Sequence, residues 1–228
     1  MIYAVGDIHG RLDLLKKLYE LIIKDSETHK EPHTIIFIGD YIDRGPESCQ
    51  VIKFLLSKPF KGFKHIMLKG NHEQMMIDEM GAYNNSGYFN KNSMWWLQGG
   101  IYTLNSYKWG LKDPVITKHL KWMEKLKVIH KQQGIIFVHA GINPETPEEE
   151  WTENEMLWIR DKFLTYTEDF GYLVVHGHCI TPDYDIWFDR LNITNRINLD
   201  TGAYKSNVLT AIAINKENKF KFIEACYK

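Results

Sequence analysis

Five short polar strings in the chain carry side chains that can bind metal ions, and each string ends or follows an apolar run. Carboxylate, amide and imidazole groups are all ligands for divalent cations. Any one string is a weak signal, but together they supply enough ligands for two ions. The strings are Gly6-Asp7-Ile8-His9-Gly10, Gly39-Asp40-Tyr41-Ile42-Asp43-Arg44-Gly45, Gly70-Asn71-His72-Glu73, Val138-His139 and His176-Gly177-His178.

The spacing of these residues predicts how they would share two ions. Asp7 and His9 are two residues apart, so an extended turn would place both side chains on one side, where they can bind one ion. Asp40 follows the next apolar run and is the natural bridge between two ions. Six protein ligands leave positions open for water and substrate, which is typical of a catalytic site. The ligands that complete the second ion would be Asn71, His139 and His178.

The other polar residues of the strings fit phosphoryl transfer. Two divalent ions about 3.5–4 Å apart can activate a shared water as a bridging hydroxide and hold phosphoryl oxygens during in-line attack. His72 is placed to protonate a leaving alkoxide, and Asp43 would orient its ring and raise its pKa. The guanidinium groups of Arg44 and Arg160 offer planar forks to phosphate oxygens. The sequence therefore predicts hydrolysis of phosphate esters.

Several of these residues also have an ordinary structural interpretation. Asp40 alone could cap a helix, and His139 could be a half-buried core histidine. Arg160 could equally be a surface residue paired with Asp161. His176 lies two residues from His178, and we interpret it as a supporting residue rather than a ligand. The recurrence of such strings at successive strand ends favours the metal site.

The apolar runs between the strings predict the elements that position them. Ranges 2–5, 34–38 and 64–68 are typical of strands, and ranges 12–22, 46–57 and 72–80 have helical spacing. This alternation predicts a parallel sheet, and α/β proteins assemble active sites at the carboxyl ends of such strands. Further strands are expected at 134–138 and 173–175. Ranges 186–188, 196–199, 208–214 and 219–224 predict a second, more antiparallel sheet.

These elements predict an α/β fold (α+β in some schemes) with a central β-sandwich flanked by helices. We expect a single domain over residues 1–228, with a helical insertion at about 81–126. The aromatic residues of that insertion could form a cap near the site or an ordinary subdomain core. The acidic range 145–155 is interpreted as a solvated loop.

The composition indicates which partners and which cellular compartment to expect. A formal net charge of -1 does not favour nucleic acid or a membrane surface as a partner. The three cysteines are widely spaced, which is typical of free thiols in a reducing compartment. We find no signal peptide and no apolar run near the roughly 20 residues that span a bilayer, so we expect a cytoplasmic protein.

The motifs GDIHG, GDYIDRG and GNHE resemble those of the PPP-type serine/threonine protein phosphatases, within the calcineurin-like metallophosphoesterase superfamily. The chain is most similar to the bacteriophage lambda phosphatase type, and this resemblance extends to ranges 70–78, 96–100, 157–160 and 200–203. It implies a calcineurin-like fold with the metals at the carboxyl ends of the strands. Cys179 departs from the pattern, in which a threonine commonly follows the last histidine.

The resemblance also implies roles for individual residues. His72 would be the general acid supported by Asp43, and Arg44 and Arg160 would contact phosphate. Two Mn²⁺ ions are the implied cofactors, with iron or zinc in relatives. Regulatory subunits are not expected. The implied ligands are Asp7, His9 and Asp40 for one ion, and Asp40, Asn71, His139 and His178 for the other.

Three functions compete. The leading hypothesis is a phosphatase acting on phosphoserine and phosphothreonine in proteins or on small phosphomonoesters. The alternative is a bis(5'-nucleosyl)-tetraphosphatase, which resembles the chain in the same motifs and splits a phosphoanhydride. Asp43 favours the phosphatase, because symmetrical dinucleoside hydrolases often lack this aspartate. A non-catalytic scaffold is the third, and a complete ligand set argues against it.

Overall fold

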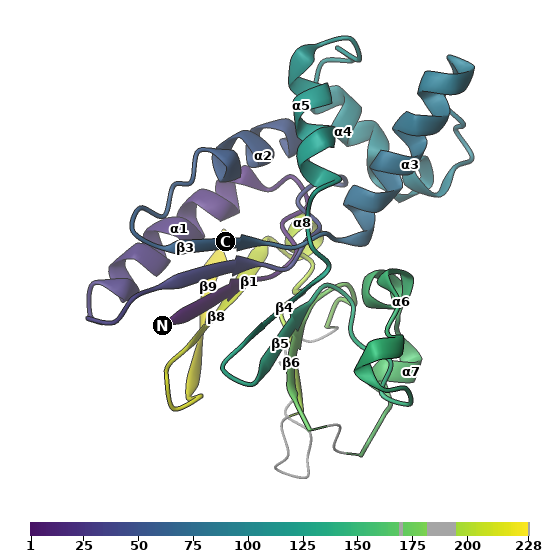
Figure 1. The fold of residues 1–228 in the computed structure, drawn as a ribbon. Helices are drawn as coiled ribbons and strands as arrows, with labels where there is room; N and C mark the ends of the chain where they lie inside the picture. The colour runs from purple at the N-terminus through teal and green to yellow at the C-terminus, as the bar shows by residue number, and fades with distance from the viewer. Residues whose placement is uncertain (169–170, 182–194, 228) are drawn as a thin grey trace.

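The computed structural model of the 228-residue chain describes residues 1–168, 171–181 and 195–227. Two β-sheets pack against each other, and helices cover their outer faces (Figure 1). The predicted α/β sandwich is therefore confirmed. The strand expected at 186–188 lies outside the described residues.

The first sheet has five strands in the order β3-β2-β1-β8-β9. The first three strands run parallel, so their carboxyl ends meet at one edge of the sheet, while β8 and β9 are antiparallel to their neighbours. The connecting helices α1 (Leu12–Ser26) and α2 (Ser48–Leu56) lie on the outer face (Figure 1). The strands are β1 (Ile2–Val5), β2 (Thr34–Phe37), β3 (Lys64–Met67), β8 (Val208–Ile214) and β9 (Phe220–Cys226).

The second sheet has four strands in the order β4-β5-β6-β7. Here β5, β6 and β7 run parallel, and only β4 is antiparallel to its neighbour. Its outer face is covered by α6 (Glu153–Trp158) and α7 (Asp161–Leu164), which follow the short 3-10 turn η2 (Glu148–Glu150) (Figure 1). The strands are β4 (Ile129–Gln132), β5 (Ile135–Val138), β6 (Leu173–His176) and β7 (Arg196–Asn198).

This topology corrects one prediction. Ranges 208–214 and 219–224 were expected in the second, antiparallel sheet, but β8 pairs with β1 and brings β9 into the first sheet. The second sheet is mainly parallel instead. An apolar strand can pair on either side of the sandwich, and its own sequence does not specify which sheet it joins.

The layers follow from the alternation of side chains along each strand. Ala4 of β1 and Phe137 of β5 belong to the core between the sheets. Tyr3 belongs with Leu18 of α1 to the core beneath the first helical layer, and Ile136 packs beneath α6 and α7. Because most strands are buried on both faces, they appear in the sequence as continuous apolar runs.

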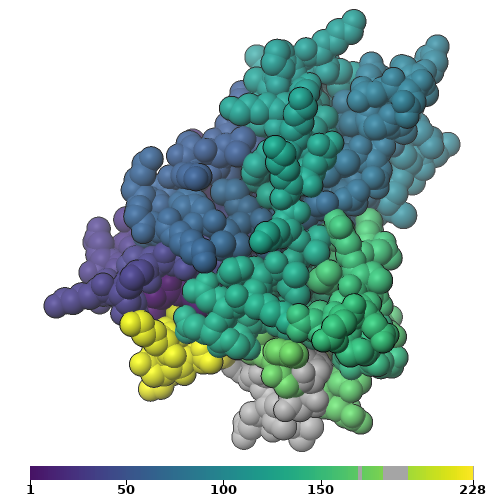
Figure 2. Space-filling view, in the orientation of Figure 1, coloured from purple at the N-terminus to yellow at the C-terminus, as the bar shows by residue number. Residues whose placement is uncertain are grey.

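Between β3 and β4 the chain is helical. This segment projects above the two sheets (Figure 1) and forms the blue-to-teal upper part of the space-filling view (Figure 2). It begins shortly after the end of β3. Its elements are α3 (Asn71–Ser86), the π-helical turn η1 (Trp96–Gly100), α4 (Ile101–Ser106) and α5 (Pro114–Met123). The short helix α8 (Ala203–Ser206) lies between β7 and β8. Among the described residues, no helix is both long enough and apolar enough to cross a bilayer.

Candidate metal centre

The six predicted ligands lie together where β1, β2, β3, β5 and β6 end. All six side chains are buried. Each follows its strand by one to four residues, so the parallel strand ends bring together residues that are far apart in the sequence. These residues are Asp7, His9, Asp40, Asn71, His139 and His178.

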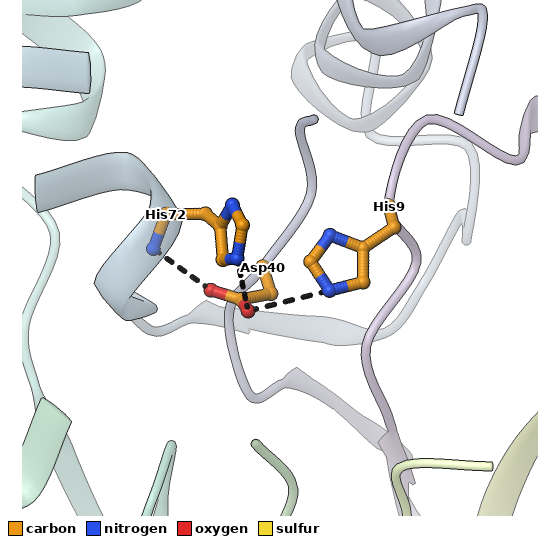
Figure 3. Close-up of side chains that lie close together, drawn as sticks. All are labelled: His9, Asp40 and His72. Carbon is orange, nitrogen blue, oxygen red and sulfur yellow. Dashed lines mark hydrogen bonds and ion pairs between the residues drawn. The ribbon is translucent and has the colours of Figure 1, made fainter. Parts of the chain in front are cut away.

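Asp40 lies between His9 and His72 (Figure 3). Its Oδ2 is 3.5 Å from Nε2 of His9 and 3.8 Å from Nε2 of His72, and its Oδ1 is 3.4 Å from Nε2 of His139. Burial alone would raise the pKa of Asp40, but the charges of His139, His72 and His9 outweigh it and hold the pKa below its usual value. Asp40 is thus an anion in contact with several possible ligands.

Two groups of side chains have ligand atoms close enough to share an ion. One contains His9, Asp40 and His72, and the other contains Asp7, Asp40 and His139. Among the described residues, Asp40 is common to both groups, as a bridging residue must be. The groups divide the other residues differently from our expectation, since His72 lies with His9 and Asp7 lies with His139.

The lone pairs of the cluster converge in a way that suits a cation. Nδ1 of His139 faces the carbonyl oxygen of Ile38 at 3.2 Å, so the tautomer with its proton on Nδ1 donates to that oxygen. The lone pair of Nε2 then points at Oδ1 of Asn71, 2.8 Å away. Nδ1 of His178 approaches the same Oδ1 at 3.0 Å. His9 is held similarly, with Nδ1 2.8 Å from the carbonyl oxygen of Ile42.

Two buried atoms of the cluster have no hydrogen-bond partner within the described structure. They are Oδ1 of Asp7 and Nε2 of His178. Burying a polar atom without a partner costs free energy, and a bound cation would remove that cost. The donor set of carboxylate, amide and imidazole groups therefore fits divalent metal ions, and these ligand types alone do not select one metal.

His72 and Asp43 form a second arrangement beside the cluster. Nδ1 of His72 donates to Oδ2 of Asp43 at 2.7 Å, and both side chains are fully buried. Burial lowers the pKa of His72, but the charges of Asp40 and Asp43 and this hydrogen bond outweigh burial and raise the pKa. His72 is therefore protonated to a higher pH than an ordinary histidine, as a proton donor requires.

The helical segment between β3 and β4 holds Asp43 in place. Oδ1 of Asp43 accepts hydrogen bonds from Oγ1 of Thr103 at 2.6 Å and from Nε1 of Trp95 at 3.1 Å. The backbone N–H of Asp43 donates to Thr103 and to Ser48. Trp95 is thus both a core residue and a hydrogen-bond donor to a predicted catalytic residue. The sequence offered no sign of this second role.

The two predicted phosphate contacts lie on different sides of the cluster. Nη1 of Arg44 is 3.0 Å from Nε2 of His9, and its Nη2 donates to Gln98 at 3.3 Å. Arg160 is exposed, and its Nη1 lies 3.4 Å from Sγ of Cys179, next to His178. The structure therefore brings both arginines to the centre, although their contact with phosphate stays a prediction.

The backbone is left-handed at five of the predicted site residues, a conformation that is uncommon outside glycine. Aspartate and histidine tolerate it better than most residues, but each instance stores some strain. Tight turns at the strand ends impose this conformation and aim the side chains into the centre. The φ angles are 45° at His9, 51° at Asp40, 69° at Asp43, 64° at Arg44 and 68° at His178.

Glu73 and Tyr204 are site residues that the sequence analysis did not assign. The buried Glu73 accepts the backbone N–H groups of Asp40 at 2.8 Å, Tyr41 at 2.9 Å and Gly70 at 2.9 Å. It thereby ties the turn after β2 to the start of α3. The ring of Tyr204 contacts His9, and the guanidinium of Arg44 lies 4.8 Å from its centroid. Only the position of Glu73 inside a motif could have drawn attention to it.

Replacing Glu73 by alanine should reduce the free energy of unfolding severely, because three buried N–H groups lose their acceptor at about 1–3 kcal/mol each. Urea denaturation of the metal-free protein measures the loss. The matched control is Glu79→Ala, on the same helix, because Glu79 accepts only the N–H of Asn90. Its expected loss is about one third as large. Equal losses for the two variants would contradict the role of Glu73.

Known proteins are similar to this chain in sequence and in fold. Residues 1–209 match the family model described as calcineurin-like phosphoesterase. The chain is 30% identical over 159 residues to the symmetrical bis(5'-nucleosyl)-tetraphosphatase of Pseudomonas putida (strain W619), covering 68% of this chain and 45% of that protein. It is 25% identical over 207 residues to the symmetrical bis(5'-nucleosyl)-tetraphosphatase of Coxiella burnetii, covering 89% of this chain and 61% of that protein.

The chain thus spans about half the length of the curated relatives that it matches. Both relatives carry the name of the alternative function, rather than that of the lambda-type protein phosphatase. A solved structure provisionally named a diadenosine tetraphosphatase superposes with a TM-score of 0.66 at 18% identity, covering 98% of this chain and 93% of that chain. At this identity the superposition establishes the fold alone.

Proposed function

Because the chain belongs to the calcineurin-like phosphoesterase family, we propose that it is a metal-dependent hydrolase of dinucleoside tetraphosphates and related phosphate compounds. The observation that carries the hydrolytic function is the convergence of six buried ligand side chains, Asp40 and five others, at one place. The names of the curated relatives support the dinucleoside tetraphosphate as substrate class. The leading hypothesis from the sequence, a protein phosphatase, becomes the second candidate.

The residues that would hold two divalent ions are the six buried ligands, with Asp40 shared between the ions. The ions would supply a water of lowered pKa as nucleophile and positive charge against the phosphoryl oxygens. Manganese is our expectation from the family resemblance. The carbonyl oxygens of Ile42 and Ile38 would keep His9 and His139 in the tautomer that directs Nε2 to an ion.

The arginines would bind the substrate. Arg44 is positioned by Gln98 and by the ring of Tyr204, which leaves its planar fork rigid enough to orient a phosphoryl group. Arg160 is exposed and would bind phosphate oxygens from the side of His178. Two arginines that lie beside different residues of the cluster, Arg44 by His9 and Arg160 by His178, suit a substrate with several phosphate groups.

The pairing of His72 with Asp43 favours the second candidate, a phosphatase for phosphomonoesters that include phosphoserine and phosphothreonine. A serine alkoxide is a poor leaving group and needs a proton, whereas a nucleoside diphosphate leaves as a stable anion. A buried acid whose pKa is raised is therefore most useful for ester substrates. This observation keeps protein phosphatase activity as a specific competing proposal.

A comparison of substrates decides between the two candidates. The manganese-loaded protein is assayed with diadenosine tetraphosphate, a phosphoserine peptide and a phosphotyrosine peptide, and kcat/KM is measured for each. We expect the largest kcat/KM for diadenosine tetraphosphate, with ADP as product of symmetrical cleavage. A larger value for the phosphoserine peptide would favour the second candidate. Full activity towards every substrate in the presence of a chelator would contradict both.

A further inference from the structure

Asp200 is a buried carboxylate beside the candidate metal centre that has no assigned role. It follows the end of β7, the sixth strand end at this edge of the sandwich, and only 1% of it is exposed. Its Oδ1 accepts the backbone N–H of Gly202 at 2.9 Å. Its Oδ2 is buried and has no hydrogen-bond partner within the described structure. An unpartnered buried carboxylate oxygen requires a physical explanation.

The neighbour of this carboxylate is Asp7. The Asp7 and Asp200 carboxyl groups lie within hydrogen-bond range of each other if one carries a proton. Oδ2 of Asp7 accepts the N–H of His178 at 3.1 Å, while Oδ1 of Asp7 is also unpartnered. Asp7 and Asp200 therefore each have one carboxylate oxygen that is buried and has no hydrogen-bond partner among the described residues.

Two glycines allow the strand ends to come this close. A Cβ at Gly6 would lie 2.2 Å from the carbonyl oxygen of Leu199, and a Cβ at Gly177 would lie 2.2 Å from Oδ1 of Asp7. The ends of β1, β6 and β7 thus meet without side chains between them. This close approach places Asp200 beside Asp7.

Two buried carboxylates repel each other strongly unless one is protonated or a cation lies between them. Asp40 adds a third acidic group near the pair. Arg44 is a cationic side chain whose charge reaches both Asp7 and Asp200, yet among the described residues its guanidinium forms hydrogen bonds with His9 and Gln98. A divalent ion at Asp7 would satisfy the free oxygens of both carboxylates.

We propose that Asp200 is a further carboxylate of the metal centre, with Oδ2 directed at the ion held by Asp7 and Gly202 fixing its orientation through Oδ1. This inference rests on the proposed function, since it assigns a residue to the same metal site. A purely structural role would be to hold the turn at residues 200–202 through Gly202. The two roles predict different effects when the charge of Asp200 is removed, because an asparagine still accepts the N–H of Gly202.

The test is Asp200→Asn, measured without substrate. Mn²⁺ alone is titrated into the metal-free protein by calorimetry, and the melting temperature of the metal-free protein is recorded. The wild type should bind two equivalents, and the variant should bind one of them about 10- to 100-fold more weakly. Its metal-free form should melt about 2–4 °C higher, because the introduced amide can donate to Oδ1 of Asp7 and the repulsion is gone.

The matched control is Thr201→Val. Oγ1 of Thr201 donates to the carbonyl oxygen of Val208 at 2.8 Å, so this variant perturbs the same turn without changing its charge. It should melt at a lower temperature and bind both Mn²⁺ equivalents as the wild type does. Asp200→Ser keeps an oxygen for Gly202 and introduces no bulk, so it must show the same weakened Mn²⁺ binding if Asp200→Asn does not fold.

Each outcome is decisive. Unchanged Mn²⁺ affinity in both Asp200 variants, with two equivalents bound by the wild type, would overturn the role of Asp200 and leave the proposed function standing. An unchanged or lower melting temperature of metal-free Asp200→Asn, together with unchanged Mn²⁺ affinity, would favour the structural role. Failure of the wild type to bind Mn²⁺ would instead overturn the proposed metal centre itself.

Discussion

Replacing Asp40 by asparagine should abolish metal-dependent hydrolysis and reduce the metal content of the protein. Among the described residues, Asp40 alone belongs to both groups of candidate ligands, so the change weakens both ion positions together. The loss of kcat/KM should exceed the roughly 100-fold effect of removing a residue that merely supports a ligand. Metal content by mass spectrometry and kcat/KM on diadenosine tetraphosphate measure the two effects.

The control for this variant is Asp78→Asn. Asp78 is exposed on α3 and accepts a hydrogen bond from Gln74. Asp78→Asn therefore makes the same change of residue type outside the metal centre. It should keep full metal content and activity. An Asp40→Asn protein that retained two ions and normal kcat/KM would exclude Asp40 as the bridge. Loss of one ion alone would show that the two positions do not share it.

The strand ends could be predicted from the sequence because a strand that is buried on both faces is a continuous run of apolar residues. Ile36 faces the second sheet while Phe37 faces the helical layer, so β2 is apolar after Thr34 and the polar string that follows it is conspicuous. Parallel pairing of β1, β2 and β3 then brings Asp7, Asp40 and Asn71 to one edge. The candidate cluster follows from this short-range pattern and one topological rule.

Contacts between residues far apart in the sequence are not indicated by any local sequence pattern. Trp95 and Thr103 are 52 and 60 residues from Asp43 in the sequence, and nothing in their neighbourhood indicates that they donate to its carboxylate. The pairing of β8 with β1 was missed for the same reason. Asp200 appeared only inside a family motif. Its significance comes from an unpartnered oxygen, which only the three-dimensional structure reveals.

Replacing His72 by asparagine should slow hydrolysis of substrates with poor leaving groups by about 10²–10⁴-fold, the usual contribution of a general acid. Aryl phosphates and diadenosine tetraphosphate should be affected far less, because their leaving groups depart without a proton. The measurement is kcat/KM for a series of phosphate esters of increasing leaving-group pKa. Metal content should not change, since the predicted ligand next to His72 is Asn71.

A second variant tests the support of the general acid His72 by Asp43. Trp95→Phe removes one hydrogen bond to Asp43 and keeps an aromatic side chain in the core, so it should produce a smaller loss with the same dependence on leaving group. Because His72 lies close to His9 and Asp40, the metal content of the variant decides whether His72 is a ligand or the general acid. If His72→Asn lost an ion and slowed all substrates equally, His72 would be a ligand. His72 would then not be the general acid, and the case for ester substrates, which depends on the pairing of His72 with Asp43, would fall with it.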